Sequence, residues 1–309
     1  MFRTYVFCGI LLILTGLVSL STPGQTVSRE FFQPSRPKVI VLLHGATDKP
    51  QLHPEKSIGQ FKFARQYWGY GFVSALLGTK GPLRTLSGTE LTAANWESAA
   101  HRSDEPLDHF LVPTNPVGDK PAASNSVPPL SVLLTYRDGS QSLVQQTKTA
   151  ISQIEKLYRA LPQQPATQPQ IILVGHSMGG NVGRYIVTNP TQPIGQLTLT
   201  ETEHTKADFL RDRTLFLITL ATPHEGSPLA DQYTWISDFL TQTPFGLQAF
   251  YEMVGIESPR AEVMAWLGAN SEATYHLKLG FWERLNTGPL APHLALRTDG
   301  TGIPVYCLG

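Results

Sequence analysis

Residues 171–180 read IILVGHSMGG, and this stretch carries most of the information about the fold. Its first four residues are apolar, as expected for a short strand that is buried on both faces of a parallel sheet. An amphipathic helix is expected from about residue 178 to residue 187. Ser177 would therefore lie in a sharp turn between a strand and a helix, the setting in which a serine side chain is exposed at the end of a sheet.

Two glycines, Gly175 and Gly179, stand two residues before and after Ser177. In so sharp a turn, side chains at these positions would collide, so glycine is expected at both, and Gly180 would let the helix sit closer still. A serine at a helix N-terminus also lies near free N–H groups that favour a developing negative charge. We therefore predict that Ser177 is a nucleophile. The alternative is a tight turn with an incidental serine. His176 is interpreted as structural and not as the base.

A serine nucleophile also needs two N–H donors at roughly 3 Å from the forming oxyanion. The N–H of Met178, the next residue in the chain, is predicted to be one of them. Residues 37–45 read PKVIVLLHG, an apolar strand that ends in a glycine. The loop after this strand would supply the second donor, which we predict to be the N–H of Ala46. The alternative is that Gly45 only ends the strand.

Further elements follow from the hydrophobic pattern. An amphipathic helix is expected at residues 142–161, and a helix interrupted by glycines at residues 58–77. Apolar runs predict three more strands, at residues 130–136, 214–220 and 302–308. The alternation of strands and helices predicts an α/β fold with a mostly parallel sheet flanked by helices. Ligands of such sheets bind beyond the carboxyl ends of the strands.

Two long stretches do not fit this alternation. Residues 78–129 are rich in Gly, Pro, Ser, Thr and Asn, and we expect them to be an insertion. Residues 228–286 are rich in aromatic residues and are expected to form short helical pieces. They are predicted to be a cap that offers apolar surface to an acyl chain, or else a helical layer whose aromatic residues form its own core.

The composition limits the classes of partner. The 309 residues are 41% hydrophobic, which is enough for a sizeable core, and 24 basic residues balance 24 acidic ones. Because the chain has no net positive charge that would attract nucleic acid, a small-molecule or lipid ester is the expected partner. The sequence does not fix the oligomeric state. No spacing of His, Cys and carboxylates predicts a metal site, and no cofactor is expected. Cys307 is interpreted as a buried small hydrophobe in the last strand.

Residues 1–21 have the pattern of a signal peptide. A short basic region precedes an apolar run that is shorter than the ~20 residues of a spanning helix, and small residues follow it at positions 19 and 21. We therefore expect a secreted or periplasmic protein. The alternatives are an uncleaved N-terminal anchor and a buried helix of the fold. Residues 22–36 are predicted to be a polar tether, and residues 37–309 the folded domain.

Three segments together resemble the α/β-hydrolase superfamily, most closely its lipases and their acyl-hydrolase relatives. These segments are the strand ending in His44 and Gly45, the elbow GHSMGG at residues 175–180 with Arg184 and Tyr185 on the following helix, and ATPHEGS at residues 221–227. The resemblance runs from residue 37 to the C-terminus, apart from residues 78–129. It implies a triad of serine, acid and histidine, and ester substrates. It also implies that His224 fixes a loop near the site, with a role as the base as the alternative.

In these hydrolases the acid follows a later strand, and the histidine follows the next one. Residues 302–308 resemble the strand that precedes the acid, and the sequence ends at Gly309. The triad acid and histidine are therefore expected beyond Gly309. If the chain is complete, Asp231 and His293 would preserve the order of serine, acid and histidine.

Together these features predict a serine hydrolase that cleaves carboxylic esters, namely a lipase or esterase that acts on apolar acyl esters through an acyl-enzyme on Ser177. Contact with a membrane or lipid surface through residues 228–286 is a further expectation. An amidase, thioesterase or acyltransferase would share every one of these motifs. A catalytically incomplete binding protein or a gene fragment is the alternative of another class.

Overall fold

The computed structural model describes residues 36–45, 64–99, 110–114, 129–137, 141–161, 168–191, 198–226, 279–288, 290 and 294–308. Several of the predicted features lie outside this part of the chain: residues 1–35, Ala46, Asp231, His293 and all of residues 228–286 before residue 279. Within it, no helix is long and apolar enough to cross a membrane.

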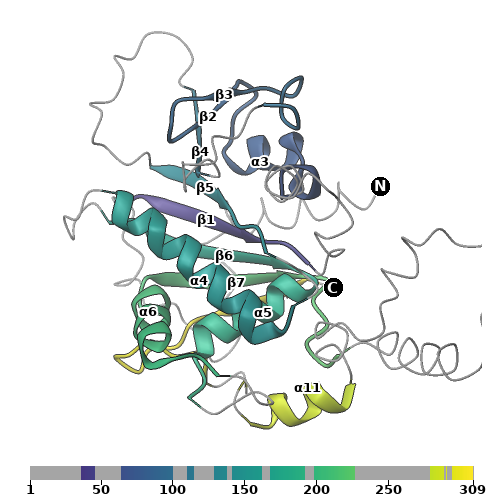
Figure 1. Cartoon of the computed structure of the whole chain (residues 1–309), viewed down its shortest axis with the longest axis vertical. Helices are drawn as coiled ribbons and strands as arrows, with labels where there is room; N and C mark the ends of the chain where they lie inside the picture. The colour runs from purple at the N-terminus through teal and green to yellow at the C-terminus, as the bar shows by residue number, and fades with distance from the viewer. Residues whose placement is uncertain are drawn as a thin grey trace, which may run out of the picture.

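In the described part of the chain, eight strands form one sheet in the order β3-β2-β4-β5-β1-β6-β7-β8 (Figure 1). Five neighbouring strands are parallel: β5 (Leu130–Leu134), β1 (Lys38–Leu43), β6 (Gln170–His176), β7 (Thr214–Leu220) and β8 (Val305–Leu308). This confirms the predicted α/β class with a mostly parallel sheet. All five strands lie where the apolar runs of the sequence place them, within a few residues at the ends.

The remaining three strands were not expected from the sequence. β2 (Leu83–Thr85), β3 (Glu90–Leu91) and β4 (Phe110–Pro113) extend the sheet beyond β5 in antiparallel pairing. They come from residues 78–129, which therefore contribute to the sheet as well as to loops. Strands of two to four residues are too short to show a period in the sequence, because a pattern of alternation needs more positions.

Helices cover both faces of the sheet because the central strands are apolar on both sides. On one face, Val39, Val41 and Leu43 pack with apolar side chains of α4 (Leu143–Ala160), α5 (Met178–Thr188) and α6 (Glu201–Arg211). Figure 1 shows these three helices in front of the sheet. On the opposite face, Ile40 and Leu42 pack with residues that include Trp68 and the Val73 side chain of α3 (Tyr70–Leu76).

The helix predicted at residues 58–77 is broken at one of its two glycines. Residues 64–68 are helical, Gly69 has a φ of 71°, and α3 begins at the next residue. A positive φ is accessible to glycine at little cost, so Gly69 lets the chain change direction here. Gly71 lies inside α3 and does not interrupt it.

The described end of the aromatic-rich stretch is helical and belongs to the main core. In α11 (Leu279–Asn286), the Trp282 side chain is fully buried among the residues of the core that includes α4 and α5. The Arg184 guanidinium lies over its ring, with Cζ 5.7 Å from the ring centroid. Trp282 therefore contributes to packing and not to an open apolar surface.

The interpretation of Cys307 as a buried residue was wrong. β8 is the last strand in the order of the described sheet, and Cys307 is exposed. An apolar run alone does not distinguish a central strand from one at the end of the order, because both can carry the same composition.

Candidate active site

Ser177 lies in the sharp turn between β6 and α5. β6 ends at His176, α5 begins at Met178, and Ser177 between them has φ 53° and ψ −129°. A positive φ strains a residue with a Cβ by about 1–3 kcal/mol, so the surrounding structure must hold this conformation. Two backbone hydrogen bonds do so: Ser177 N–H donates to Leu220 O at 2.9 Å, and Gly180 N–H donates to Ser177 O at 3.0 Å.

The glycines of the turn allow the backbone to approach closely on several sides. A Cβ on Gly175 would stand 2.5 Å from Gly180 Cα, and a Cβ on Gly179 would overlap the carbonyl oxygen of Leu43. A Cβ on Gly180 would overlap the Thr222 hydroxyl. A Cβ on Gly175 would also lie 2.6 Å from the Gly179 carbonyl carbon, so the turn itself and the end of β1 both leave no room for side chains here.

The end of β1 meets the turn at Gly45. A Cβ added to Gly45 would lie 2.9 Å from Ser177 Cβ and 3.2 Å from Ser177 Oγ. The structure thus brings together the two segments that the sequence analysis assigned to one site, the end of the first strand and the turn at Ser177. It does not describe Ala46, the residue that follows Gly45.

A buried histidine and a buried arginine fix the backbone at Gly45. The Arg137 N–H donates to His44 Nε2 at 3.0 Å, so this nitrogen carries no proton, and His44 Nδ1–H donates to Gly45 O at 2.8 Å. The Arg137 guanidinium also donates to His44 O. Burial and the charge of Arg137 lower the pKa of His44 from 6.5 to about 3. His44 is therefore neutral, and both of its ring nitrogens are already used.

Tyr67 contacts both sides of this junction and was not singled out from the sequence. Gly45 N–H donates to the Tyr67 hydroxyl at 3.0 Å, and the same hydroxyl hydrogen-bonds to His176 Nδ1. His176 thus has a structural partner, as its interpretation required. A tyrosine within a broken helical pattern carries no sequence signal for such a role, because only the fold brings residue 67 next to residues 45 and 176.

Met178 is fully buried at the first position of α5. The N–H groups of a first helical turn have no partner within the helix, so the Met178 N–H is suited to bind an anion. In the part of the chain that the structure describes, no histidine or carboxylate side chain forms a hydrogen bond with Ser177 Oγ. Within the same residues, no group of three or more His, Cys, Asp or Glu could hold a metal ion.

His224 holds the loop after β7. Its Nε2 hydrogen-bonds to Thr219 Oγ1 at 2.9 Å, and the Asn286 side chain of α11 donates to His224 O at 2.8 Å. Burial and the charge of Arg184 lower the pKa of His224 from 6.5 to about 4. These contacts fit the loop-fixing role that the resemblance implies. Asp231 and His293, the other residues considered for the triad, lie outside the described residues.

Comparisons with known proteins show a similarity to one family over part of the chain. Residues 134–249 match the family described as a PGAP1-like alpha/beta domain. Among solved structures, the chain is similar to the lipase BlEst2 of Bacillus licheniformis in its mature form, at 13% sequence identity and a TM-score of 0.37, over 89% of this chain and 66% of that one. The propeptide form gives 14% identity and a TM-score of 0.34, over 83% of this chain and 33% of that one. The chain therefore spans just under two thirds of the mature lipase. No curated protein sequence matches it.

Proposed function

We propose that this protein, which has a mostly parallel α/β sheet and matches the PGAP1-like alpha/beta domain over residues 134–249, is a serine hydrolase that cleaves carboxylic esters. Ser177 Oγ attacks the ester carbonyl carbon while a base accepts its proton. The tetrahedral intermediate then expels the alcohol, which takes up that proton, and leaves an acyl group on Ser177. Water attacks the acyl-enzyme in the same way and releases the acid.

One observation carries this proposal: Ser177 is held at a φ of 53° in the turn between β6 and α5. A residue other than glycine keeps such a conformation only where its surroundings impose it, and such strain is concentrated at functional sites. A serine in a strained turn from strand to helix is the arrangement in which an α/β hydrolase exposes its nucleophile. The glycines around Ser177, namely Gly45 at the end of β1 and Gly179 and Gly180 in α5, support its role as the nucleophile because they let the backbone pack closely around the turn.

The oxyanion would be bound by the N–H groups of Met178 and Ala46. A trans peptide points its N–H away from its C=O. Because the His44 ring holds Gly45 O at 2.8 Å, it would also fix the direction of the N–H that follows, which belongs to Ala46. The buried Arg137 guanidinium, which donates to His44 O, would hold the preceding peptide in the same way. Donors fixed before the reaction need no reorganisation as negative charge develops.

The substrate is proposed to be an apolar acyl ester. Residues 228–286 are rich in aromatic side chains, and a balanced charge gives the chain no general attraction for anionic partners. We propose that the part of this stretch before α11 contacts the acyl chain or a lipid surface, since Trp282 of α11 is buried in the core.

We also propose that residues 1–21 direct export. Cell fractionation and mass spectrometry test this. We expect exported protein whose chain begins after Ser21, and protein found only in the cytoplasm would contradict the proposal.

The hydrolase proposal is tested with p-nitrophenyl esters from acetate to palmitate. Wild-type protein should hydrolyse them, and Ser177→Ala should lower kcat by roughly 10⁴-fold or more, since the nucleophile is lost. Ser98→Ala is the matched control, because Ser98 is an exposed serine in a turn away from α5. An anilide, a thioester and an added alcohol acceptor distinguish an amidase, a thioesterase and an acyltransferase. Equal hydrolysis by wild type and Ser177→Ala would rule out the proposed nucleophile.

A further inference from the structure

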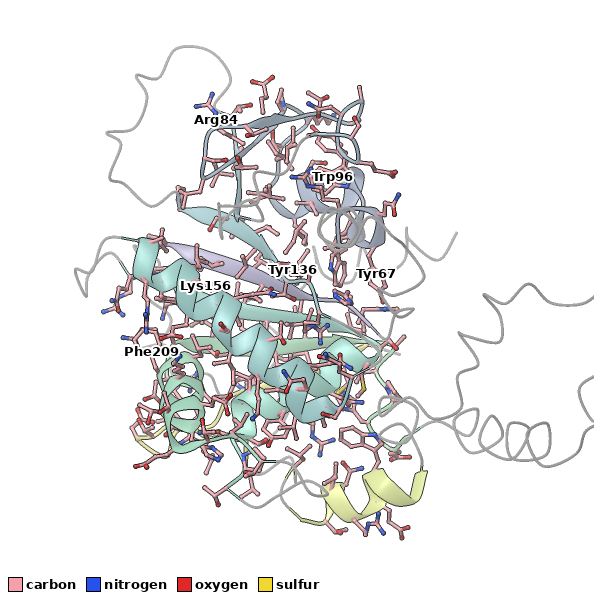
Figure 2. The ribbon with its side chains drawn as sticks, viewed as in Figure 1. Tyr67, Arg84, Trp96, Tyr136, Lys156 and Phe209 are labelled. Atoms are coloured by element: carbon pink, nitrogen blue, oxygen red, sulfur yellow. The ribbon has the colours of Figure 1, made fainter. Side chains whose placement is uncertain are left out.

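Tyr67 connects the two segments that carry the proposed chemistry. Its hydroxyl accepts the Gly45 N–H at 3.0 Å and hydrogen-bonds to His176 Nδ1, so one oxygen atom joins the end of β1 to the end of β6. Its ring also lies against the rings of both histidines, with centroid distances of 5.6 Å to His44 and to His176. Figure 2 shows Tyr67 between the helical segment before α3 and the sheet.

The Tyr67 hydroxyl also lies close to the proposed nucleophile. The Cβ position built on Gly45 is 2.7 Å from the Tyr67 oxygen and 3.2 Å from Ser177 Oγ. The two oxygen atoms therefore flank the same point. Loss of the Tyr67 hydroxyl would therefore remove a contact that holds Gly45, at the end of β1, beside Ser177.

The hydrogen bonds are consistent with one placement of the hydroxyl proton. Gly45 N–H can only donate, so the Tyr67 oxygen accepts there, and the hydroxyl can donate its proton to His176 Nδ1. This arrangement needs a neutral imidazole with its proton on Nε2. Burial lowers the pKa of His176 and raises the pKa of Tyr67, so both groups are neutral at pH 7.

We propose that Tyr67 is a positioning residue of the Ser177 site: its hydroxyl sets the spacing between the oxyanion loop at Gly45 and the turn at His176. This inference rests on the proposed hydrolase function. Tyr67 neither attacks the substrate nor accepts a proton from it. It holds the Gly45 backbone next to Ser177, and would thereby set the direction of the following N–H that is proposed to bind the oxyanion. A misplacement of about 1 Å at such a site lowers the rate by about 10²-fold.

Tyr67→Phe removes the hydroxyl and keeps the ring. We expect kcat for a p-nitrophenyl ester to fall about 10- to 100-fold while KM changes less than about twofold, because the donors act on the transition state and not on the bound ester. The matched control is Tyr70→Phe in α3, which removes a hydroxyl that donates to Gly81 O at 2.8 Å. Its kcat should equal that of wild type.

A second measurement does not depend on activity. Amide hydrogen exchange at Gly45, followed by NMR with glycine labelled in ¹⁵N, should accelerate about 3- to 10-fold in Tyr67→Phe and not in Tyr70→Phe, since one hydrogen bond to this N–H is lost. If Tyr67→Phe does not fold, His176→Leu removes the acceptor of the hydroxyl proton. This variant should also lower kcat at constant KM, by a smaller factor than that expected for Tyr67→Phe.

The outcomes separate this inference from the proposed function. If wild type hydrolyses the ester and Tyr67→Phe matches Tyr70→Phe in kcat, the positioning role is overturned. A parallel change in kcat, KM and stability would also overturn it, because this indicates a general structural defect. If wild type does not hydrolyse any ester, the proposed function fails, and the exchange at Gly45 alone decides whether Tyr67 holds the loop.

Discussion

Gly45 and Ser177 lie so close that a Cβ on Gly45 would stand 2.9 Å from Ser177 Cβ and 2.7 Å from the Tyr67 hydroxyl oxygen. Distances below 3.0 Å force one of the neighbours to move. We therefore expect Gly45→Ala to lower kcat by about 100-fold or more, since the loop and the serine would separate. Overpacking should also lower the free energy of unfolding by about 1–3 kcal/mol. Ester kinetics and urea unfolding measure the two effects.

Gly71→Ala is the control for this change. Gly71 lies inside α3, and a Cβ there would meet nothing within 4 Å. Alanine in a helix is more stable than glycine by about 0.5–1 kcal/mol, so this variant should be slightly stabilised and fully active. A Gly45→Ala variant that behaves like Gly71→Ala would show that the close approach has no role.

Gly180 and Thr222 should show strong coupling. A Cβ on Gly180 would overlap the Thr222 hydroxyl and lie 2.7 Å from Thr222 Cγ2, so Gly180→Ala should lower the free energy of unfolding by about 1–3 kcal/mol. Thr222→Gly removes all of these atoms. In the double variant, most of the loss caused by Gly180→Ala should disappear, which gives a coupling energy of about 1–3 kcal/mol in a double-mutant cycle. Strictly additive effects would contradict the contact.

Stability should fall in mildly acidic solution. The pKa of His44 is lowered to about 3 and the pKa of His224 to about 4, chiefly by burial, whereas both imidazoles have a pKa near 6.5 in the unfolded chain. Below pH 6.5 the unfolded state therefore binds protons that the folded state does not, and the free energy of unfolding decreases as pH falls towards 4.

Urea unfolding at pH values from 7.5 to 5 measures this decrease, which approaches about 1.4 kcal/mol per pH unit for each imidazole. His224→Gln should show a shallower decrease than wild type, because one of the two imidazoles is absent. A free energy of unfolding that stays constant or rises as the pH is lowered from 6.5 to 5 would contradict the assignment of neutral imidazoles to His44 and His224.

Thr200 should stabilise α6 through a capping box. Its hydroxyl accepts the Glu203 N–H at 3.3 Å, and the Glu203 carboxylate accepts the Thr200 N–H at 2.7 Å. Thr200→Ala should lower the free energy of unfolding by about 1 kcal/mol. Thr202→Ala, at an exposed position of the same helix, should have an effect below about 0.5 kcal/mol. Thermal unfolding of both variants checks this, and equal melting temperatures would contradict the cap.

The same capping box is a sequence signal for a helix that was not predicted. α6 has an irregular apolar pattern, yet Thr200 followed three residues later by Glu203 is a recognised start signal for a helix, and it could have predicted this element. The short strands β2, β3 and β4 offered no such signal. The parallel strands were predictable because each is an apolar run long enough to be buried on both faces.

The site was predictable only where its parts are local in sequence. The turn around Ser177 and the end of β1 carry glycines in a recognisable pattern, and the structure brings them together. Tyr67 and Arg137 lie far from either segment in sequence, and their contacts with His176 and His44 exist only in the folded chain. Such long-range hydrogen bonds leave no periodicity or spacing in a single sequence.

The most direct test of the central claim is covalent labelling of the full-length protein with a fluorophosphonate probe, followed by peptide mapping. An activated serine attacks the phosphorus, expels fluoride and forms a stable adduct, whereas an ordinary serine does not react. We predict one modified residue, Ser177, and no labelling of Ser177→Ala or of urea-unfolded wild type. Folded wild-type protein that stays unlabelled, or that is labelled at another serine, would contradict the assignment of Ser177 as the nucleophile.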